Sequence, residues 1–343
     1  MRHPARLGIA LTIALSTAGC TASTGGSAPP DRADTATAGV TTVMSCGRKL
    51  TFDKAPERAV TLDQNATETL LELGLTGRMA GTSNLKTRIP DQYRAAYARV
   101  PVLNPRILTG EQLRAAAPDV VVASFADLYT KDRAGTREEL GALELPAYTS
   151  AVDCPERSEP GRTPFDLLFD DYRNYGRIFG VEDRAAALAK KQRTAVEKAA
   201  ATAAKVRGNG ARKPTVVWVY SVFNGAPYVA GRSGMPSAMS AIVGARNAFD
   251  DVNEDWPEVT WEEVARRDPD FIVLGDLSER GRPGDSAEEK RALMREDPVV
   301  SQLKAVRENR IIEAPGIEMD PSVRSVNTLG LLAKGMKDLG HAR

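Results

Sequence analysis

From Arg58 onward, the hydrophobic positions of this chain form short apolar runs that alternate with stretches of helical periodicity. The apolar runs predict strands at 59–62, 78–82, 119–123 and 147–150 in the first half, and at 215–220, 227–230, 271–274 and 310–313 in the second. Helices are expected at 66–73, 91–98, 136–143, 236–243, 261–267, 287–295 and 326–339. This alternation is typical of an α/β fold, in which helices cover a parallel sheet.

A long helical stretch separates the two halves. The pattern over 164–207 is marked by Gly176 and Gly180 and then runs without interruption from Asp183 to Lys205. At about 1.5 Å per residue, that last part is about 35 Å long and could run the length of a domain. We therefore expect an N-terminal α/β lobe at 46–163, a bridging helix at 164–207, a C-terminal α/β lobe at 208–343, and a ligand cleft between the lobes.

The two halves also share an internal repeat. Residues 109–122 match residues 260–273 at a constant offset of 151 positions. Three kinds of position coincide in the two copies: Thr109 and Thr260, Glu111 and Glu262, and the Pro-Asp pairs at 118–119 and 269–270. Each copy predicts a short helix, a Pro-Asp turn and a buried strand. The lobes are therefore expected to follow one plan, with a pseudo-twofold relation between them.

The first residues have the layout of an export signal. Arg2 and Arg6 precede an apolar run at 7–15, which is far shorter than the roughly 20 residues of a spanning helix. The segment 15–20 reads Leu-Ser-Thr-Ala-Gly-Cys and resembles the lipobox of bacterial lipoproteins, although Thr17 stands where that pattern usually has leucine. We expect a signal peptide at 1–19, a lipid on Cys20 and a flexible linker at 20–45. An ordinary signal peptide followed by an unmodified cysteine is the alternative.

Charge and cysteine content agree with an exported chain. The 46 Lys and Arg residues, two of them in the signal, balance 45 Asp and Glu residues, which argues against a nucleic-acid partner. Besides Cys20 the chain has only Cys46 and Cys154. An even pair in an exported protein favours a disulfide, so we expect a bond between Cys46 and Cys154.

The sequence lacks the residues that common enzymes need. His3 and His341 are the only histidines, which excludes a Ser-His-Asp triad, a histidine general base or a histidine-based zinc site in the folded body. A phosphate-binding loop is absent, and the Gly-Asn-Gly at 208–210 precedes a strand instead of following one. We expect no catalytic residue, metal site or cofactor. An enzyme that relies on carboxylates remains the alternative.

Candidate binding residues follow the carboxyl ends of the expected strands, where open α/β sheets bind ligands. Asn65 and Trp256 are candidates at the cleft, although Asn65 with Glu68 also fits a capping box, which we favour for Glu68. Flat walls are expected from Phe125, Tyr129, Tyr220, Phe223 and Tyr228, and contacts to an anionic ligand from Lys86, Arg88 and Arg232. A tyrosine at a strand end can equally be a half-buried rim residue. Trp218 and Trp261 are assigned to packing.

These segments carry a family resemblance. Residues 55–74, the two Glu-to-Pro-Asp segments and Gly-Ala-Arg-Asn at 244–247 resemble the periplasmic-binding-protein family that serves iron-siderophore and vitamin B12 ABC importers. The resemblance implies two Rossmann-like lobes bridged by one long helix. It also implies that Glu111 and Glu262 dock on the permease, whose ATPase completes the importer. Composition alone would favour solvated helical glutamates at both positions.

The ligand is less narrowly defined by the resemblance. Absence of histidine argues against a bare zinc or manganese ion, whereas a metal wrapped in an organic chelator needs only aromatic walls and a few charges. A ferric siderophore is the first expectation, with cobalamin or haem as alternatives in the same role. We expect a monomer on the extracytoplasmic face of the cell membrane, held there only by its lipid. A lipid-anchored sensor or adhesion module without transport is the other class of function.

Overall fold

The computed structural model describes residues 39–154, 161–206 and 212–341. Residues Ala38–Arg343 form one compact unit, which contains both lobes. The expected signal peptide at 1–19, Cys20 and most of the linker lie outside the described residues. In the part of the chain that is described, no helix combines the length and apolar character needed to cross a membrane.

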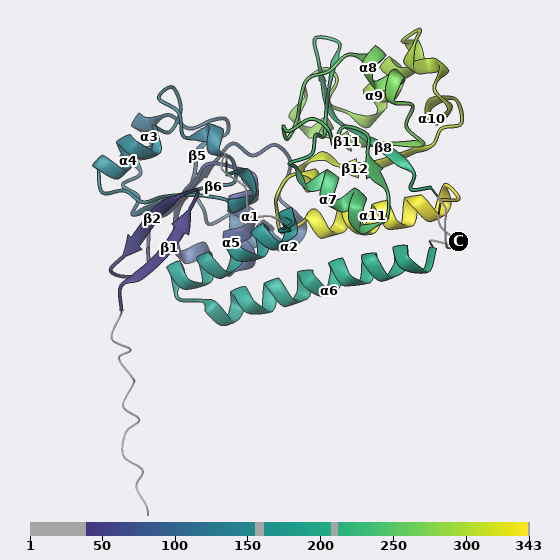
Figure 1. Ribbon diagram of the computed structural model, residues 1–343. Helices are drawn as coiled ribbons and strands as arrows, with labels where there is room; N and C mark the ends of the chain where they lie inside the picture. Colours follow the sequence, from purple (N-terminus) through teal and green to yellow (C-terminus); the bar gives the residue numbers. More distant parts are fainter. Residues whose placement is uncertain (1–38, 155–160, 207–211, 342–343) are drawn as a thin grey trace, which may run out of the picture. The chain divides into compact units, whose positions relative to one another are not determined.

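The first lobe, called the N-lobe, contains a five-stranded parallel sheet in the order β5-β4-β3-β6-β7 (Figure 1). The central strands are buried because their side chains are almost all apolar, which is typical of sheets covered on both faces. The strands are β3 (Ala59–Thr61), β4 (Met79–Ser83), β5 (Val102–Asn104), β6 (Val120–Ala123) and β7 (Ala147–Thr149), and the helices are α1 (Gln64–Glu72), α2 (Asp91–Tyr97), α3 (Gly110–Ala115) and α4 (Arg137–Ala142).

The second lobe, called the C-lobe, has a parallel sheet in the order β10-β8-β11-β12, with β9 added antiparallel to β8. Its strands are β8 (Thr215–Phe223), β9 (Ala226–Val229), β10 (Arg246–Asn247), β11 (Phe271–Asp276) and β12 (Ile311–Pro315), and its helices are α7 (Met235–Ile242), α8 (Trp261–Arg267), α9 (Ala287–Glu296), α10 (Lys304–Arg307) and α11 (Ser325–Asp338). The expected fold of two α/β lobes with parallel sheets is confirmed.

The bridging region consists of two helices, α5 (Pro164–Phe179) and α6 (Glu182–Val206), and α6 is the long helix expected from the sequence. The break falls at Gly180, whose φ of 64° ends α5 in a left-handed cap. Gly176 lets the two helices approach closely, since a Cβ there would lie 2.7 Å from the Cβ of Ala185. Figure 1 shows α6 running alongside both α5 and α11. Arg184 of α6 also donates to the carbonyl oxygen of Leu73 in the N-lobe at 3.0 Å, so α6 contacts both lobes.

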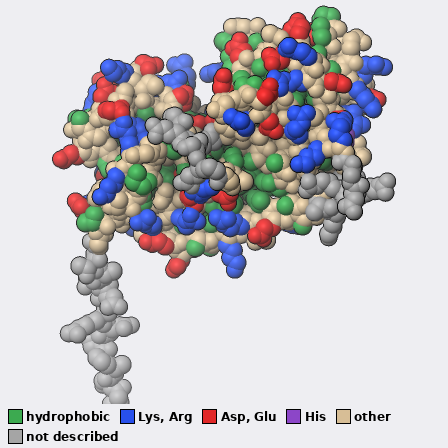
Figure 2. All heavy atoms as spheres, in the orientation of Figure 1, with side chains coloured by type: hydrophobic (Ala, Val, Ile, Leu, Met, Phe, Trp, Pro, Cys, Tyr) green, Lys and Arg blue, Asp and Glu red, His purple; other side chains and the backbone are tan. Residues whose placement is uncertain are grey.

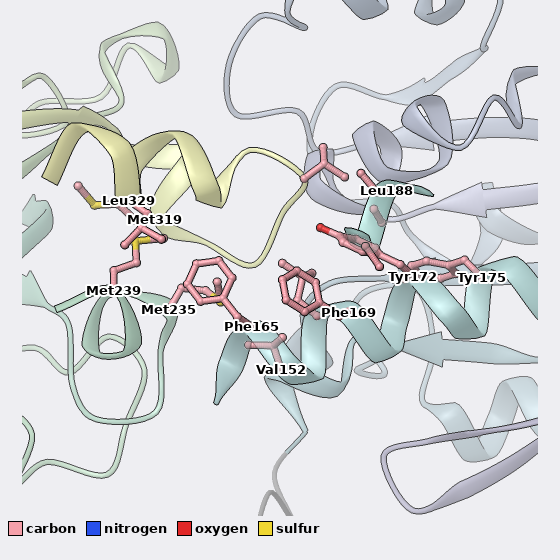
Figure 3. Close-up of a cluster of buried hydrophobic side chains, with 14 of the residues drawn as sticks. Val152, Phe165, Phe169, Tyr172, Tyr175, Leu188, Met235, Met239, Met319 and Leu329 are labelled. Carbon is pink, nitrogen blue, oxygen red and sulfur yellow. The ribbon is translucent and has the colours of Figure 1, made fainter. Parts of the chain in front are cut away.

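One apolar cluster extends through both lobes and the bridging helices. In Figure 3, aromatic side chains of α5 lie between Leu188 of α6 and the methionines of the C-lobe; the labelled members include Phe165, Phe169, Tyr172, Met235, Met239 and Met319. Because a close-packed interior resists deformation, this shared core limits how far the lobes can move relative to each other.

The folded part begins earlier than expected. Thr41–Ser45 form strand β1, which pairs antiparallel with β2 (Arg48–Phe52), so the expected linker at 20–45 is wrong over its last residues. Cys46 and Gly47 form the turn, both with positive φ (45° and 72°), as tight hairpins require. A disulfide joins Cys46 to Cys154, the pairing expected from the cysteine count, and ties this hairpin to the N-lobe.

The internal repeat is visible in the backbone. Thr109 and Thr260 both cap a helix through their side chains, on Gln112 and Glu263 respectively. Ala117 and Asp268, at matching positions after these helices, both have a left-handed backbone, with φ of 44° and 41°.

The Pro-Asp aspartates of the repeat also perform the same task in each lobe. Asp119 accepts hydrogen bonds from the backbone of Glu57 and Arg58 at 2.7 and 2.9 Å, just before β3. Asp270 accepts one from the backbone of Thr215 at 2.6 Å, at the start of β8. The two lobes therefore share local structure and not only sequence.

Candidate functional site

The carboxyl end of β3 leads into α1, and the cap there differs from the expected one. Asp63 caps the helix and accepts hydrogen bonds from the backbone of Ala66 at 2.9 Å and Ser124 at 2.6 Å. Burial raises the pKa of Asp63, and these hydrogen bonds counteract part of that effect. The expected capping box of Asn65 with Glu68 is wrong, since both residues lie inside the helix and are buried.

Lys86 lies where the two lobes meet. Its loop is fixed to the N-lobe because Gln64 Oε1 accepts from the backbone of Lys86 and Thr87, each at 2.9 Å. Its ammonium donates to Tyr220 Oη at 2.9 Å and to Asp320 Oδ2 at 3.0 Å, both in the C-lobe. Burial by itself lowers the pKa of Lys86, but Asp320 and Tyr220 outweigh burial and raise it. The lysine is therefore a charged link between the lobes.

Aromatic rings surround this link. The ammonium of Lys86 lies 4.8 Å from the ring centre of Phe125, which follows β6, and 5.4 Å from that of Tyr220, in the second half of β8. The ring of Tyr220 in turn packs on Trp256, with their centres 4.5 Å apart. Lys86, Phe125, Tyr220 and Trp256 are thus brought together as the sequence predicted.

A hollow of about 280 Å³ opens on the C-lobe side of these rings. Four of the expected aromatic residues line it, together with two arginines outside the expected set: Tyr220, Phe223, Tyr228, Trp256, Arg280 and Arg282. Phe223 is 58% exposed at its rim, and the hydroxyl of Tyr228 donates to Glu258. The hollow combines flat apolar walls with two arginines and the carboxylate of Asp285, and apolar walls with a few polar groups are typical of small-molecule sites.

Arg280 is one of the functional candidates that the sequence analysis missed on the C-lobe, together with Arg282 and Asp320. Its Nε donates to Asp285 Oδ2 at 2.7 Å, and its guanidinium lies 5.8 Å from the ring centre of Tyr220. Burial lowers the pKa of Arg280, but the hydrogen bond to Asp285 and nearby negative groups raise it overall. The segment is anchored by Lys290, which donates to the carbonyl oxygens of Gly275 and Asp285. The signal was its position just beyond the end of β11.

A second charged contact crosses between the lobes. Arg324 at the start of α11 donates to Glu318 at 3.0 Å and lies 3.4 Å from Glu68 Oε1 of the N-lobe. Burial raises the pKa of Glu68, while Arg324 opposes that shift. Within the described residues, Glu68 Oε2 and both amide atoms of Asn65 are buried without a hydrogen-bond partner. Asn65, which was expected to bind ligand, therefore lies buried inside α1 and does not line the hollow described above.

Three other expected ligand residues lie apart from this cluster. Tyr129 is in the N-lobe core, with its hydroxyl donating to the carbonyl oxygen of Tyr148 at 2.7 Å, so the expectation that it forms a wall of the cleft is wrong. Arg88 is exposed and pairs with Glu279 across the lobes at 2.8 Å. Arg232 lines a separate hollow of about 600 Å³ beside the disulfide.

The two candidate docking glutamates are exposed. Glu111 lies in the first turn of α3 and Glu262 in the first turn of α8. Figure 1 shows these helices on the side of each lobe away from α6. In Figure 2, Lys and Arg side chains are interspersed with Asp and Glu over the visible face, in keeping with the balanced charge of the sequence. Two carboxylates at equivalent places suit a partner that presents two equivalent surfaces.

Comparison with known proteins gives consistent results. The family model for periplasmic binding proteins matches residues 60–317. A cobalamin-binding protein of Halobacterium salinarum is 27% identical over 235 residues, covering 67% of this chain and 57% of the relative, so the chain spans just over half of that protein's length.

Solved structures are similar over nearly the whole folded part. A periplasmic binding protein from Veillonella parvula superposes with a TM-score of 0.74 at 24% identity, covering 87% of this chain and 97% of the other. A structure described as an ABC-type Fe³⁺-hydroxamate transport system, from Saccharomonospora viridis, has a TM-score of 0.71 and 26% identity, covering 86% and 98%.

Proposed function

Because this chain belongs to the periplasmic binding protein family, we propose that it captures a ferric siderophore outside the cytoplasm and delivers it to an ABC importer. The family binds siderophores, haem or cobalamin for transport and does not catalyse reactions. A permease, its ATPase and a small-molecule ligand are the partners that this role implies.

The observation that carries the proposal is the aromatic and charged cluster between the lobes. Phe125 from one lobe and Tyr220 with Trp256 from the other present ring faces within a few ångströms of charged groups. A metal chelate has a broad apolar periphery around a charged centre, so it suits ring faces with a small number of charges. Phe125 follows the carboxyl end of β6, and Tyr220 follows the part of β8 that pairs in parallel with β11, which is the edge where α/β sheets bind ligands.

A hydroxamate siderophore is our first candidate. The similar structure from Saccharomonospora viridis, described as part of an Fe³⁺-hydroxamate transport system, is covered over 98% of its length by this chain. Cobalamin is the second candidate, favoured by the relative from Halobacterium salinarum, of which this chain covers 57%.

Delivery requires that the receptor reach its permease. We assign docking to Glu111 and Glu262, and membrane attachment to a lipid on Cys20, with the protein acting as a monomer. A double-chain lipid on one cysteine anchors a protein stably, and residues 21–38 would act as a tether rich in Ser, Thr, Gly and Pro.

The ligand class can be tested by following the tryptophan fluorescence of the purified protein. The probes are a ferric trihydroxamate, a ferric tricatecholate, cyanocobalamin and haemin. We expect saturable quenching with the trihydroxamate, strongly reduced in Trp256→Phe and retained in the matched control Trp261→Phe, whose tryptophan is buried in the C-lobe core. Saturation by cyanocobalamin alone would establish the second candidate. Failure of all four probes to bind would overturn the proposed function.

A further inference from the structure

Residues 85–89, which lie between β4 and α2, form a segment that we call the strap. The strap has no regular secondary structure, and within the described residues no backbone–backbone hydrogen bond involves it. Leu85 and Ile89 at its two ends pack against the apolar core that both lobes share. The residues between these two ends are held by side chains alone.

Two ion pairs fasten the strap to the C-lobe. Lys86 Nζ lies 3.0 Å from Asp320 Oδ2, and Arg88 Nε lies 2.8 Å from Glu279 Oε1. The backbone N–H of Arg88 also donates to Glu279. The side chain of Asp320 is 1% exposed, so breaking the first pair is costly, whereas that of Arg88 is 86% exposed, so the second pair adds little stability.

One residue attaches the strap to the N-lobe. Gln64 Oε1 accepts hydrogen bonds from the backbone of Lys86 and Thr87, each at 2.9 Å. Its Nε2 donates to Thr87 Oγ1 at 3.0 Å. A segment without backbone hydrogen bonds of its own opens at a lower free energy than the sheets and helices around it.

The strap contacts both sides of the proposed binding cluster. The ammonium of Lys86 lies 4.8 Å from the ring centre of Phe125 in the N-lobe and 5.4 Å from that of Tyr220 in the C-lobe. Glu279, which accepts from Arg88, directly precedes Arg280 in the wall of the hollow. A ligand that contacts the rings of both lobes must therefore reach the place where the strap joins them.

Movement of a whole lobe is a less favourable route to this place. The apolar core that runs through both lobes is close-packed and resists deformation. The contact between Arg324 and Glu68 joins the start of α11 to α1, so it also links elements of regular structure. The strap, in contrast, can move without displacing a helix or a sheet.

We propose that the strap is a gate for the ligand: it is closed while Lys86 and Arg88 are paired with the C-lobe carboxylates, and the ligand enters and leaves when these pairs break. The inference rests on the proposed function and adds a local route of access to it. Loosening a gate speeds both entry and exit, whereas loss of a ligand contact speeds mainly exit.

Stopped-flow tryptophan quenching with the ferric complex of desferrioxamine B measures the association and dissociation rate constants. Lys86→Met with Asp320→Asn removes the buried pair without leaving a charge unpaired, and both constants should rise about tenfold. Arg88→Gln breaks only the exposed pair, which is not expected to impair folding, and should raise both about threefold. Arg94→Gln removes an exposed ion pair within α2 and is the matched control, with rates as in the wild type.

Hydrogen exchange measured by mass spectrometry tests the opening of the strap without any ligand. A peptide that covers residues 85–89 should exchange about tenfold faster in the double variant, about threefold faster in Arg88→Gln, and at the wild-type rate in Arg94→Gln. Unchanged exchange in both strap variants, or a rise in the dissociation rate alone, overturns the gate and leaves the proposed function intact. If the wild type does not bind the ferric complex, the proposed hydroxamate ligand and its gate are both overturned.

Discussion

The two lobes carry equivalent residues at the start of α3 and of α8, but different residues where they meet. In the N-lobe, Thr109 caps α3 and Glu111 follows it; in the C-lobe, Thr260 caps α8 and Glu262 follows it. Where the lobes meet, the N-lobe contributes Lys86 and Phe125, while the C-lobe contributes Tyr220, Trp256, Arg280 and Asp320. A repeated surface suits a partner with two equivalent subunits, whereas a single asymmetric ligand needs different residues from each side. In our proposal the repeated surface serves delivery and the asymmetric cluster serves capture.

The largest expected effect comes from removing the symmetric pair. Glu111→Ala combined with Glu262→Ala should reduce iron uptake by cells about a hundredfold or more, because the proposed docking contact loses both of its carboxylates, while chelate affinity stays unchanged. Uptake of ⁵⁵Fe-loaded chelate and fluorescence titration of the purified variant measure the two properties. Glu57→Ala with Glu197→Ala, two exposed glutamates outside α3 and α8, is a matched double control. Normal uptake by the docking variant would contradict the assignment.

The disulfide attaches the β1–β2 hairpin to the N-lobe, so its loss should destabilise the protein through the N-lobe. The bond closes a loop of 108 positions, and Cys46→Ser with Cys154→Ser should lower the free energy of unfolding by about 2–4 kcal/mol. Urea denaturation of the oxidised protein and the variant measures this change. Cys20→Ser is the control and should unfold as the wild type does. Equal midpoints for the two variants would show that the bond does not stabilise the fold.

Asp171 on the bridging helix α5 should make the stability of the protein depend on pH. It is buried and accepts hydrogen bonds from Tyr148, Ser150 and Ala151, and burial raises its pKa from 3.8 to about 6. The folded protein therefore keeps this proton to a higher pH than the unfolded chain does. Its contribution to stability is complete below about pH 4 and falls by up to about 3 kcal/mol as pH rises to about 6.

Urea denaturation at a series of pH values measures this slope. Asp171→Asn should flatten it between pH 4 and 6, since the amide does not titrate. Asp183→Asn, an exposed aspartate at the start of α6, should leave it as in the wild type. A slope that is the same in all three proteins would assign the pH dependence to other groups.

The smallest expected effect concerns one ring of the asymmetric cleft. Trp256→Ala removes the partner of Tyr220 and should weaken chelate binding about tenfold, or about 1.4 kcal/mol. Trp256→Phe keeps a ring and should restore most of the affinity. Titration of both variants measures the change. Docking should be unaffected, so uptake at saturating chelate should remain normal. A loss of uptake at saturating chelate would show that Trp256 also affects delivery, which would contradict the proposed division of roles.

The sequence predicted the buried strands and the repeat well, because both depend on local pattern. β3, β6, β8 and β11 are apolar runs whose burial dictates their place in a sheet. The β1–β2 hairpin was missed because Met44 is apolar although exposed, and because β2 begins with two polar residues, so the apolar alternation is short and irregular. The helical region at 164–207 forms two helices because Gly180 adopts a left-handed backbone that ends α5. The sequence pattern marked Gly180, but it did not show that the helix ends there.

The site was predictable only in part, because its members come from loops that tertiary structure brings together. Lys86, Phe125, Tyr220 and Trp256 were found from their places near strand ends. Tyr129 is near a strand end too, but the turn after β6 directs it into the core. Glu68 was interpreted as a cap because its partner Arg324 is 256 positions away, beyond any local pattern.

The position of iron in crystals grown with a ferric trihydroxamate tests the account most directly. Anomalous scattering at the iron edge locates the metal without assumptions about the ligand. We predict a single iron between Phe125 of the N-lobe and Trp256 of the C-lobe, with Glu111 and Glu262 still exposed. Iron bound elsewhere on the protein, or a cleft without iron at saturating chelate, would contradict the account.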